Sequence, residues 1–343
     1  LPSPRIAVDT VRVGPEEAPI FTADRVELEV DLSPLLKREI DVVALTFVGP
    51  HVRATIDPAG MIHGPVVNLA DGPLDWVDPA KVQFDQIEVV DGQVLVDDLR
   101  TGESMLIDRV NLQGSGRSVH GPFEATGEAR FDGTPYGFRF ATGTYAAAGT
   151  FPIKARISPS DRAVDFTIDG ALDTAQSPEH YVGDLTIAPR PVEDADAEIA
   201  PIPWSATGVL DLTADGLTVR DGEIRYGPIE QPVVLAAGLD LPFSSEEGFR
   251  LDVASRQMDL DGVLKAMGRG SDDARPAERI APLVEALHAV PAVSARGVVT
   301  ARLASVVAGG AVIRNVSAEA RPTEDGWRIV SARAGFPGET NAA

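Results

Sequence analysis

The stretch that decides the fold reads Val26-Glu27-Leu28-Glu29-Val30-Asp31-Leu32, in which apolar and acidic side chains alternate without a break. Successive side chains of a β-strand point to opposite faces, so this pattern predicts a strand with one apolar and one charged face. The same alternation recurs in residues 52–57, 151–157, 164–168, 204–212 and 249–253. Strands of this kind are typical of antiparallel sheets with one face in water.

Turn chemistry agrees with a sheet of hairpins. Eight Asp-Gly dipeptides punctuate the chain, beginning at Asp71, Asp91, Asp132, Asp169, Asp215, Asp221, Asp261 and Asp325. Asp-Gly favours a type I′ hairpin turn, because both central residues of that turn need a positive φ. We expect such turns at Asp91-Gly92 and Asp132-Gly133, and another at Gly309-Gly310. The pattern predicts a meander of hairpins rather than a crossover fold.

Few segments have helical periodicity. A single turn is expected at Ser33–Lys37, where a serine N-cap precedes proline. Residues 259–268 place Leu260, Val263, Leu264 and Met267 on one helical face. The longest helix is expected at 276–290, where the apolar spacing is three and four, and Pro291 ends it. The expected class is mostly β, with a few short helices.

The length of 343 residues allows one large or two ordinary domains. We interpret residues 1–190 as one β-sheet segment and 191–203 as an acidic, proline-rich linker. Residues 204–343 then form a second β segment that carries the helix at 276–290. Both ends enter or leave in the middle of a pattern, so we expect a truncated chain.

Composition excludes several classes of function. The chain has 52 acidic and 30 basic residues, a net charge of −22, which repels nucleic acids and anionic membrane surfaces. Cysteine is absent, which rules out disulfides, thiolate zinc sites and cysteine nucleophiles. No apolar run approaches the ~20 residues that a membrane-spanning helix needs.

Catalytic and metal-binding motifs are not found. The five histidines, His51, His63, His120, His180 and His288, are not spaced as metal-ligand pairs. There is no G-x-S-x-G elbow and no phosphate-binding glycine loop. The acidic run Glu193–Glu198 lacks the spacing of a calcium loop and is interpreted as a solvated linker. We therefore predict neither an enzyme nor a bound cofactor or metal.

Several short phrases resemble the AsmA-like family of bacterial envelope proteins. The first runs from Ala23 to Leu36 and includes the alternating stretch quoted above. Others follow in order at residues 40–42, 45–50, 56–60, 87–97, 121–127, 325–327 and 334–338. The resemblance extends along most of the chain.

The resemblance implies a lipid-handling role at the periplasmic side of the bacterial inner membrane. Such proteins are anchored by an N-terminal helix, which this chain lacks, and contribute to outer-membrane assembly and lipid homeostasis. Their long curved sheet, shaped like a groove or taco, shelters phospholipid acyl chains on its apolar face. The implied partners are phospholipid and unidentified envelope proteins.

This role assigns candidate residues from the alternating segments. The expected groove lining is Val26, Leu28, Val30, Val52, Ile56, Phe138, Phe140, Ile153, Ile157, Phe166 and Ile168. The expected rim helix at 276–290 contributes Ile280, Leu283, Val284 and Leu287.

Alternation alone leaves other structures open. Apolar strand faces most often seal against each other in a sandwich, and only the resemblance favours an open groove. A closed core would indicate a non-catalytic envelope scaffold or interaction module. A carbohydrate-active protein ranks last, because three Trp and four Tyr offer no platform flanked by acids.

Overall fold

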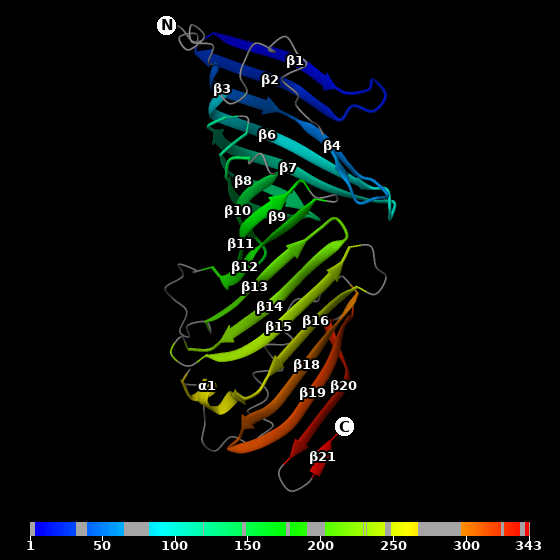
Figure 1. The fold of residues 1–343 in the computed structure, drawn as a ribbon, viewed down its shortest axis with the longest axis vertical. Coiled ribbons are helices and arrows are strands. Elements are labelled where there is room, and N and C mark those ends of the chain that lie inside the picture. The colour runs from blue at the N-terminus through cyan, green and yellow to red at the C-terminus, as the bar shows by residue number, and fades with distance from the viewer. Residues whose placement is uncertain are drawn as a thin grey trace. The chain divides into compact units, whose positions relative to one another are not determined.

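The computed structural model describes residues 4–31, 40–64, 82–118, 120–145, 149–175, 179–190, 203–228, 230, 232–243, 248–266, 296–323, 326–336 and 340–342. These residues form 21 strands and one short helix, which confirms the mostly β prediction (Figure 1). The chain divides into two compact units, Leu1–Gly183 and Asp184–Ala343, which are described separately.

The first unit contains eleven strands and the start of a twelfth. They are β1 (Arg5–Val13), β2 (Phe21–Asp31), β3 (Ile40–Val48), β4 (His51–Ile56), β5 (Ile62–His63), β6 (Val82–Asp98), β7 (Glu103–Gly116), β8 (Phe123–Phe131), β9 (Thr134–Thr142), β10 (Thr150–Pro159) and β11 (Val164–Asp173). β12 (His180–Pro189) contains the boundary between the units.

Most neighbours in the first unit pair antiparallel. From β6 to β11 each strand pairs with the next along the chain, as a meander requires (Figure 1). The exception is the parallel pairing of β3 and β4 with β6. Residues 57–81 separate β4 from β6, and parallel neighbours need a connection of about this length. The expectation of hairpins alone was therefore wrong at this point.

The second unit contains the remaining strands and the helix. They are β13 (Trp204–Leu212), β14 (Gly216–Tyr226), β15 (Val233–Pro242), β16 (Phe249–Ser255), β17 (Met258–Asp259), α1 (Leu260–Ala266), β18 (Gly297–Ala308), β19 (Ala311–Thr323), β20 (Gly326–Phe336) and β21 (Thr340–Ala342). Here too the pairing is antiparallel, except that β16 and β17 run parallel to β18 after a connection that includes α1.

The expected helix at 259–268 is observed as α1, Leu260–Ala266. Asp259 caps its first turn, accepting a hydrogen bond from the Gly262 amide at 2.8 Å. The expected turn at Ser33–Lys37, the linker at 191–203 (apart from Pro203) and the helix at 276–290, with Ile280, Leu283, Val284 and Leu287, lie outside the described residues.

Asp-Gly dipeptides take two different roles. Asp132 and Gly133 both have positive φ, 46° and 76°, and form the predicted hairpin turn between β8 and β9. Asp91-Gly92, however, lies inside β6, where the register with β7 shifts. Asp221-Gly222 likewise lies inside β14. The prediction of a turn at Asp91 was wrong, because a single left-handed residue can also be absorbed as a β-bulge.

Left-handed residues recur inside the strands and shift their alternation. Thr10, Asp91, Arg109, Asp221 and Asn315 all have φ between 49° and 57°. A side chain built at Gly92 would meet Val89 Cγ1 at 2.9 Å, although the two positions are three residues apart. Regular alternation would place them on opposite faces. The bulge therefore returns the apolar side chains beyond it to the face they occupied before.

Candidate functional site: the apolar sheet faces

In the first unit, strand register aligns the predicted lining residues of β9 to β11 in two adjacent rows. Directly paired residues of neighbouring strands share a face. One row is Gly127, Phe138, Ile157 and Phe166. The next is Ala125, Phe140, Ala155 and Ile168. Ile153 lies two residues before Ala155 and therefore faces the same side.

The same face continues to the N-terminal strands. Gly127 pairs with Leu112 of β7, and Leu112 pairs with Val89 of β6. Val89 in turn pairs with Phe47 of β3. Three predicted lining residues complete the face, paired with β3 as Val26–Phe47, Leu28–Leu45 and Val30–Val42.

Val52 and Ile56 reach this face through a bend between β3 and β4. Val52 pairs with Phe21 of β2, whose ring contacts Phe47 with centroids 6.0 Å apart. Rings on opposite faces of a sheet could not meet at this distance. Ile56 lies four residues beyond Val52 in β4 and points the same way. All eleven residues predicted from the sequence thus share one face of the first unit.

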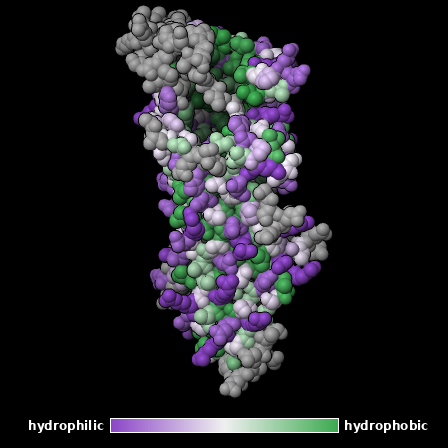
Figure 2. Space-filling view, turned by 45° about the vertical axis from the view of Figure 1, so that its right-hand side comes forward, coloured by the Kyte–Doolittle hydropathy of each residue, from purple (hydrophilic) through white to green (hydrophobic). Residues whose placement is uncertain are grey.

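This face is only partly covered. None of the eleven residues is fully buried, and the Ile157 side is open enough to leave that residue 39% exposed. At the β1 end, Ile6 and Val8 pair with Leu28 and Val26 and are 55% and 51% exposed. In the space-filling view, hydrophobic surface lines a hollow close to the N-terminal strands (Figure 2). A sealed sandwich would bury these side chains.

The second unit has an apolar groove of its own, of about 430 Å³. Its side-chain lining carries one hydroxyl and no charge. It consists of Leu185, Ile187, Ala206, Thr207, Val219, Gly222, Ile224, Ala237, Gly238, Leu239, Leu241, Phe249 and Leu251. The sequence prediction named no lining residue here. Val219 and Ile224 are five residues apart, and the bulge at Asp221 hid the fact that they share a face.

Helix α1 covers one end of this apolar face. Leu260 and Val263 of the helix are buried, 2% and 4% exposed, in a cluster with Val233, Met258, Val306, Ala308 and Ile313. Leu235 packs against the cluster and pairs with Ile224 of the groove. Both oxygens of Asp261 accept backbone hydrogen bonds, from Gly309 at 2.8 Å and Gly310 at 2.7 Å, which fixes α1 to the β18–β19 turn.

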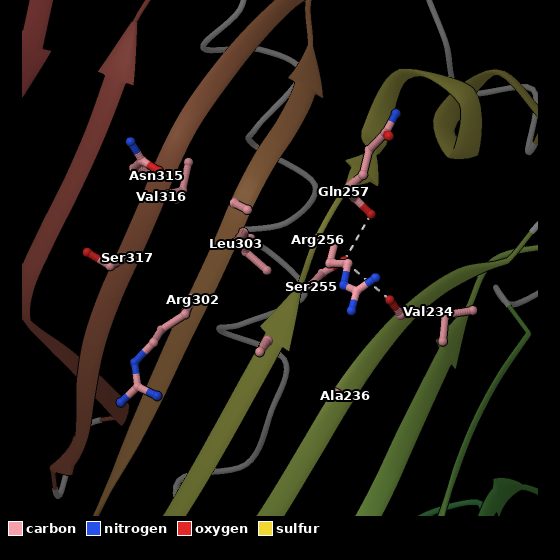
Figure 3. A pocket seen from close by; sticks show the side chains of 12 residues that line it. Val234, Ala236, Ser255, Arg256, Gln257, Arg302, Leu303, Asn315, Val316 and Ser317 are labelled. Carbon is pink, nitrogen blue, oxygen red and sulfur yellow. Dashed lines mark hydrogen bonds between the residues drawn. The ribbon is translucent and has the colours of Figure 1, made fainter.

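A wider hollow of about 870 Å³ lies where β16, β18 and β19 bend (Figure 3). Arg256 and Arg302 lie on either side of Leu303 in this view, and Arg302 approaches Asp252 at 3.5 Å. The Ser255 hydroxyl is within hydrogen-bond distance of two backbone carbonyls, Gln257 at 2.9 Å and Val234 at 3.3 Å. The lining includes no histidine or carboxylate, so a serine nucleophile would have no base beside it here.

Charged pairs stabilise the edges of the first unit rather than form a reaction centre. Arg100 donates to Asp98 through Nη2 at 2.7 Å and Nε at 3.0 Å, which lowers the pKa of Asp98 to about 2. The Arg130 guanidinium similarly lowers the pKa of Asp108. In the described part of the chain, no group of three or more His, Asp or Glu side chains is placed to hold a metal ion. No described helix has the length and apolarity to span a bilayer.

Comparison with protein-family models, with curated proteins and with solved structures gives no match for this chain. Functional interpretation therefore depends on the geometry of the two apolar faces.

Proposed function

We propose that the protein shelters phospholipid acyl chains on the apolar face of its first unit, as a non-catalytic lipid carrier of the AsmA-like type. The observation that carries the proposal is the shared orientation of the eleven lining residues, all of them half-buried or exposed. A soluble domain rarely leaves an apolar area of this extent open to water unless another molecule covers it.

The energetics of a lipid chain suit such a face. Burying one methylene group contributes about 0.8 kcal/mol, so ~14 methylenes contribute on the order of 11 kcal/mol. Contact with Phe138, Phe140 and Phe166 supplies this burial without hydrogen bonds. Because the face offers few directed polar groups, it would hold acyl chains with little selectivity for the headgroup.

The resemblance gives the proposal its setting. A protein of this type would act at the periplasmic side of the inner membrane, with a membrane anchor supplied outside this chain. Its partners would be phospholipid and other envelope proteins, and its contribution would be to outer-membrane assembly and lipid homeostasis.

Phospholipid retention by matched variants tests the proposal. The whole chain is expressed in a Gram-negative host and purified without detergent, and lipid phosphorus per protein is measured beside native mass spectra. Phe166→Glu places a charge on the apolar face and should reduce bound phospholipid several-fold. Thr167→Glu adds the same charge to the opposite face of the same strand and should retain it.

Circular dichroism establishes that both variants keep their sheet. Wild-type protein free of lipid, or equal lipid loss in both variants, would contradict the proposal and favour an envelope scaffold with a closed core.

A further inference from the structure

On the opposite face of the first unit, two arginines stand directly across from each other. Arg139 of β9 pairs in register with Arg156 of β10. Side chains at such positions start from Cβ atoms about 5 Å apart, and like charges placed there destabilise a sheet. Thr126 of β8 pairs with Arg139, and Thr167 of β11 pairs with Arg156. Four adjacent strands thus present a row of hydroxyl, guanidinium, guanidinium and hydroxyl.

This row lines a hollow of about 540 Å³ with a basic surface. Lys154 and the Ser158 hydroxyl also line it, and no carboxylate does. Gly137 pairs with Ser158, and the nearest atom to a side chain built at Gly137 would be 3.8 Å away. The absence of a side chain there leaves room above the sheet.

The two arginines have few partners within the chain. Arg139 donates one hydrogen bond, from Nε to Thr126 Oγ1 at 3.2 Å. Within the part of the chain that the structure describes, the Arg156 side chain has neither a hydrogen bond nor an ion pair. This is unusual in a chain with 52 acidic and 30 basic residues, where carboxylates are abundant.

Neighbouring carboxylates on this face are otherwise engaged or set apart. Asp169 pairs with Lys154 at 2.6 Å, and Asp165 accepts a hydrogen bond from Ser158 at 2.7 Å. Glu128 pairs in register with Gly137 and does not line the hollow. The guanidinium donors of Arg139 and Arg156 are therefore left to an external anion.

We propose that this hollow binds a phosphate group between Arg139 and Arg156. Each guanidinium can offer two parallel N–H donors to an oxyanion. A tetrahedral phosphoryl group has three terminal oxygens and can meet forks from two strands at once, whereas a planar carboxylate fits one fork. Thr126 and Thr167 lie at the two ends of the row. The site is on the opposite face from the acyl-chain surface and does not depend on that function.

Binding of inorganic phosphate to the whole chain tests the site, measured by calorimetry and by the shift of the thermal unfolding midpoint. Arg139→Gln and Arg156→Gln should each weaken binding about tenfold or more. Arg225→Gln removes an arginine that pairs with Glu223 in the second unit and should leave binding unchanged. Without phosphate, Arg139→Gln should raise the unfolding midpoint, because it removes the cross-strand repulsion.

Vesicles distinguish the sources of the phosphate group. Flotation with phosphatidylcholine vesicles is compared with flotation after addition of phosphatidic acid. Binding of inorganic phosphate that requires both arginines supports a soluble phosphorylated ligand, and arginine-dependent flotation with phosphatidic acid alone supports a lipid headgroup. Binding that survives both substitutions, or no binding of either probe at millimolar phosphate, overturns the proposal.

Discussion

The rings of Phe21 and Phe47 meet edge to face, with centroids 6.0 Å apart and an angle of 84° between their planes. In regular alternation Phe21 would face away from Val26, which pairs with Phe47. The contact shows that the apolar face passes through the bend between β3 and β4 without changing sides. A lipid chain lying on this face would meet apolar side chains before and after the bend.

The bulge at Asp91 is the first feature that substitutions can test. Its φ of 52° suits Gly, Asn or Asp and strains a β-branched residue. Asp91→Val should lower the free energy of unfolding by about 1–3 kcal/mol. Asp91→Gly should cost far less, and denaturant unfolding of both variants measures the difference. Equal effects of the two substitutions would show that the carboxylate, not the backbone, is what matters.

The attachment of α1 through Asp261 predicts a larger loss. Asp261→Ala leaves the amides of Gly309 and Gly310 without their acceptor, at a cost of about 2–4 kcal/mol for two charge-assisted hydrogen bonds. Asp240→Ala is the matched control, an exposed aspartate on β15. Hydrogen exchange should show faster exchange at residues 309 and 310 only in Asp261→Ala. Unchanged exchange there would contradict the proposed anchoring.

Acid should weaken the β6–β7 edge through Asp98. Because Arg100 lowers the folded pKa of Asp98 to about 2 from an ordinary value near 4, its stabilisation is complete above pH 4. It is lost as the pH falls from about 4 to about 2, on the order of 2 kcal/mol in total. Asp98→Asn should flatten this part of the stability profile, which Asp240→Asn should leave as in the wild type. An unaltered slope in Asp98→Asn would refute the assignment.

Asp41 predicts a stabilising substitution. It pairs in register with Asp31, and its Oδ1 is buried without a hydrogen-bond partner among the described residues. Burial first, and then the charges of Asp85 and Asp31, raise the pKa of Asp41. Asp41→Asn should therefore raise stability at pH 7 by roughly 0.5–1 kcal/mol. The gain should shrink as the pH falls below the raised pKa, and a loss of stability at pH 7 would contradict this prediction.

Sequence reasoning identified the strands of the first unit and all eleven residues of its apolar face, because period-two alternation directly reports which side chains share a face. It failed where a left-handed residue shifts that alternation. At Asp91 the dipeptide signal for a turn is the same as the signal for a bulge, since both need a positive φ. In β14 the bulge at Asp221 separated Val219 from Ile224 by an odd spacing, and the second groove went unpredicted.

The arginine pair also escaped sequence reasoning, for a different reason. Arg139 and Arg156 lie on separate strands, and only the register of β9 with β10 brings them opposite each other. Register depends on turn geometry and on the packing of the other face, which short patterns do not encode.

Photocrosslinking tests the central claim most directly, that the apolar face of the first unit holds acyl chains. A benzophenone amino acid is placed at Phe140 or Ile157 on that face, and at Ala141 or Glu128 on the opposite face, in cells that express the whole chain. The account predicts phospholipid adducts, seen by intact-protein mass spectrometry, at Phe140 and Ile157 and none at Ala141 and Glu128. Adducts absent from all four positions, or equally frequent on both faces, would contradict it.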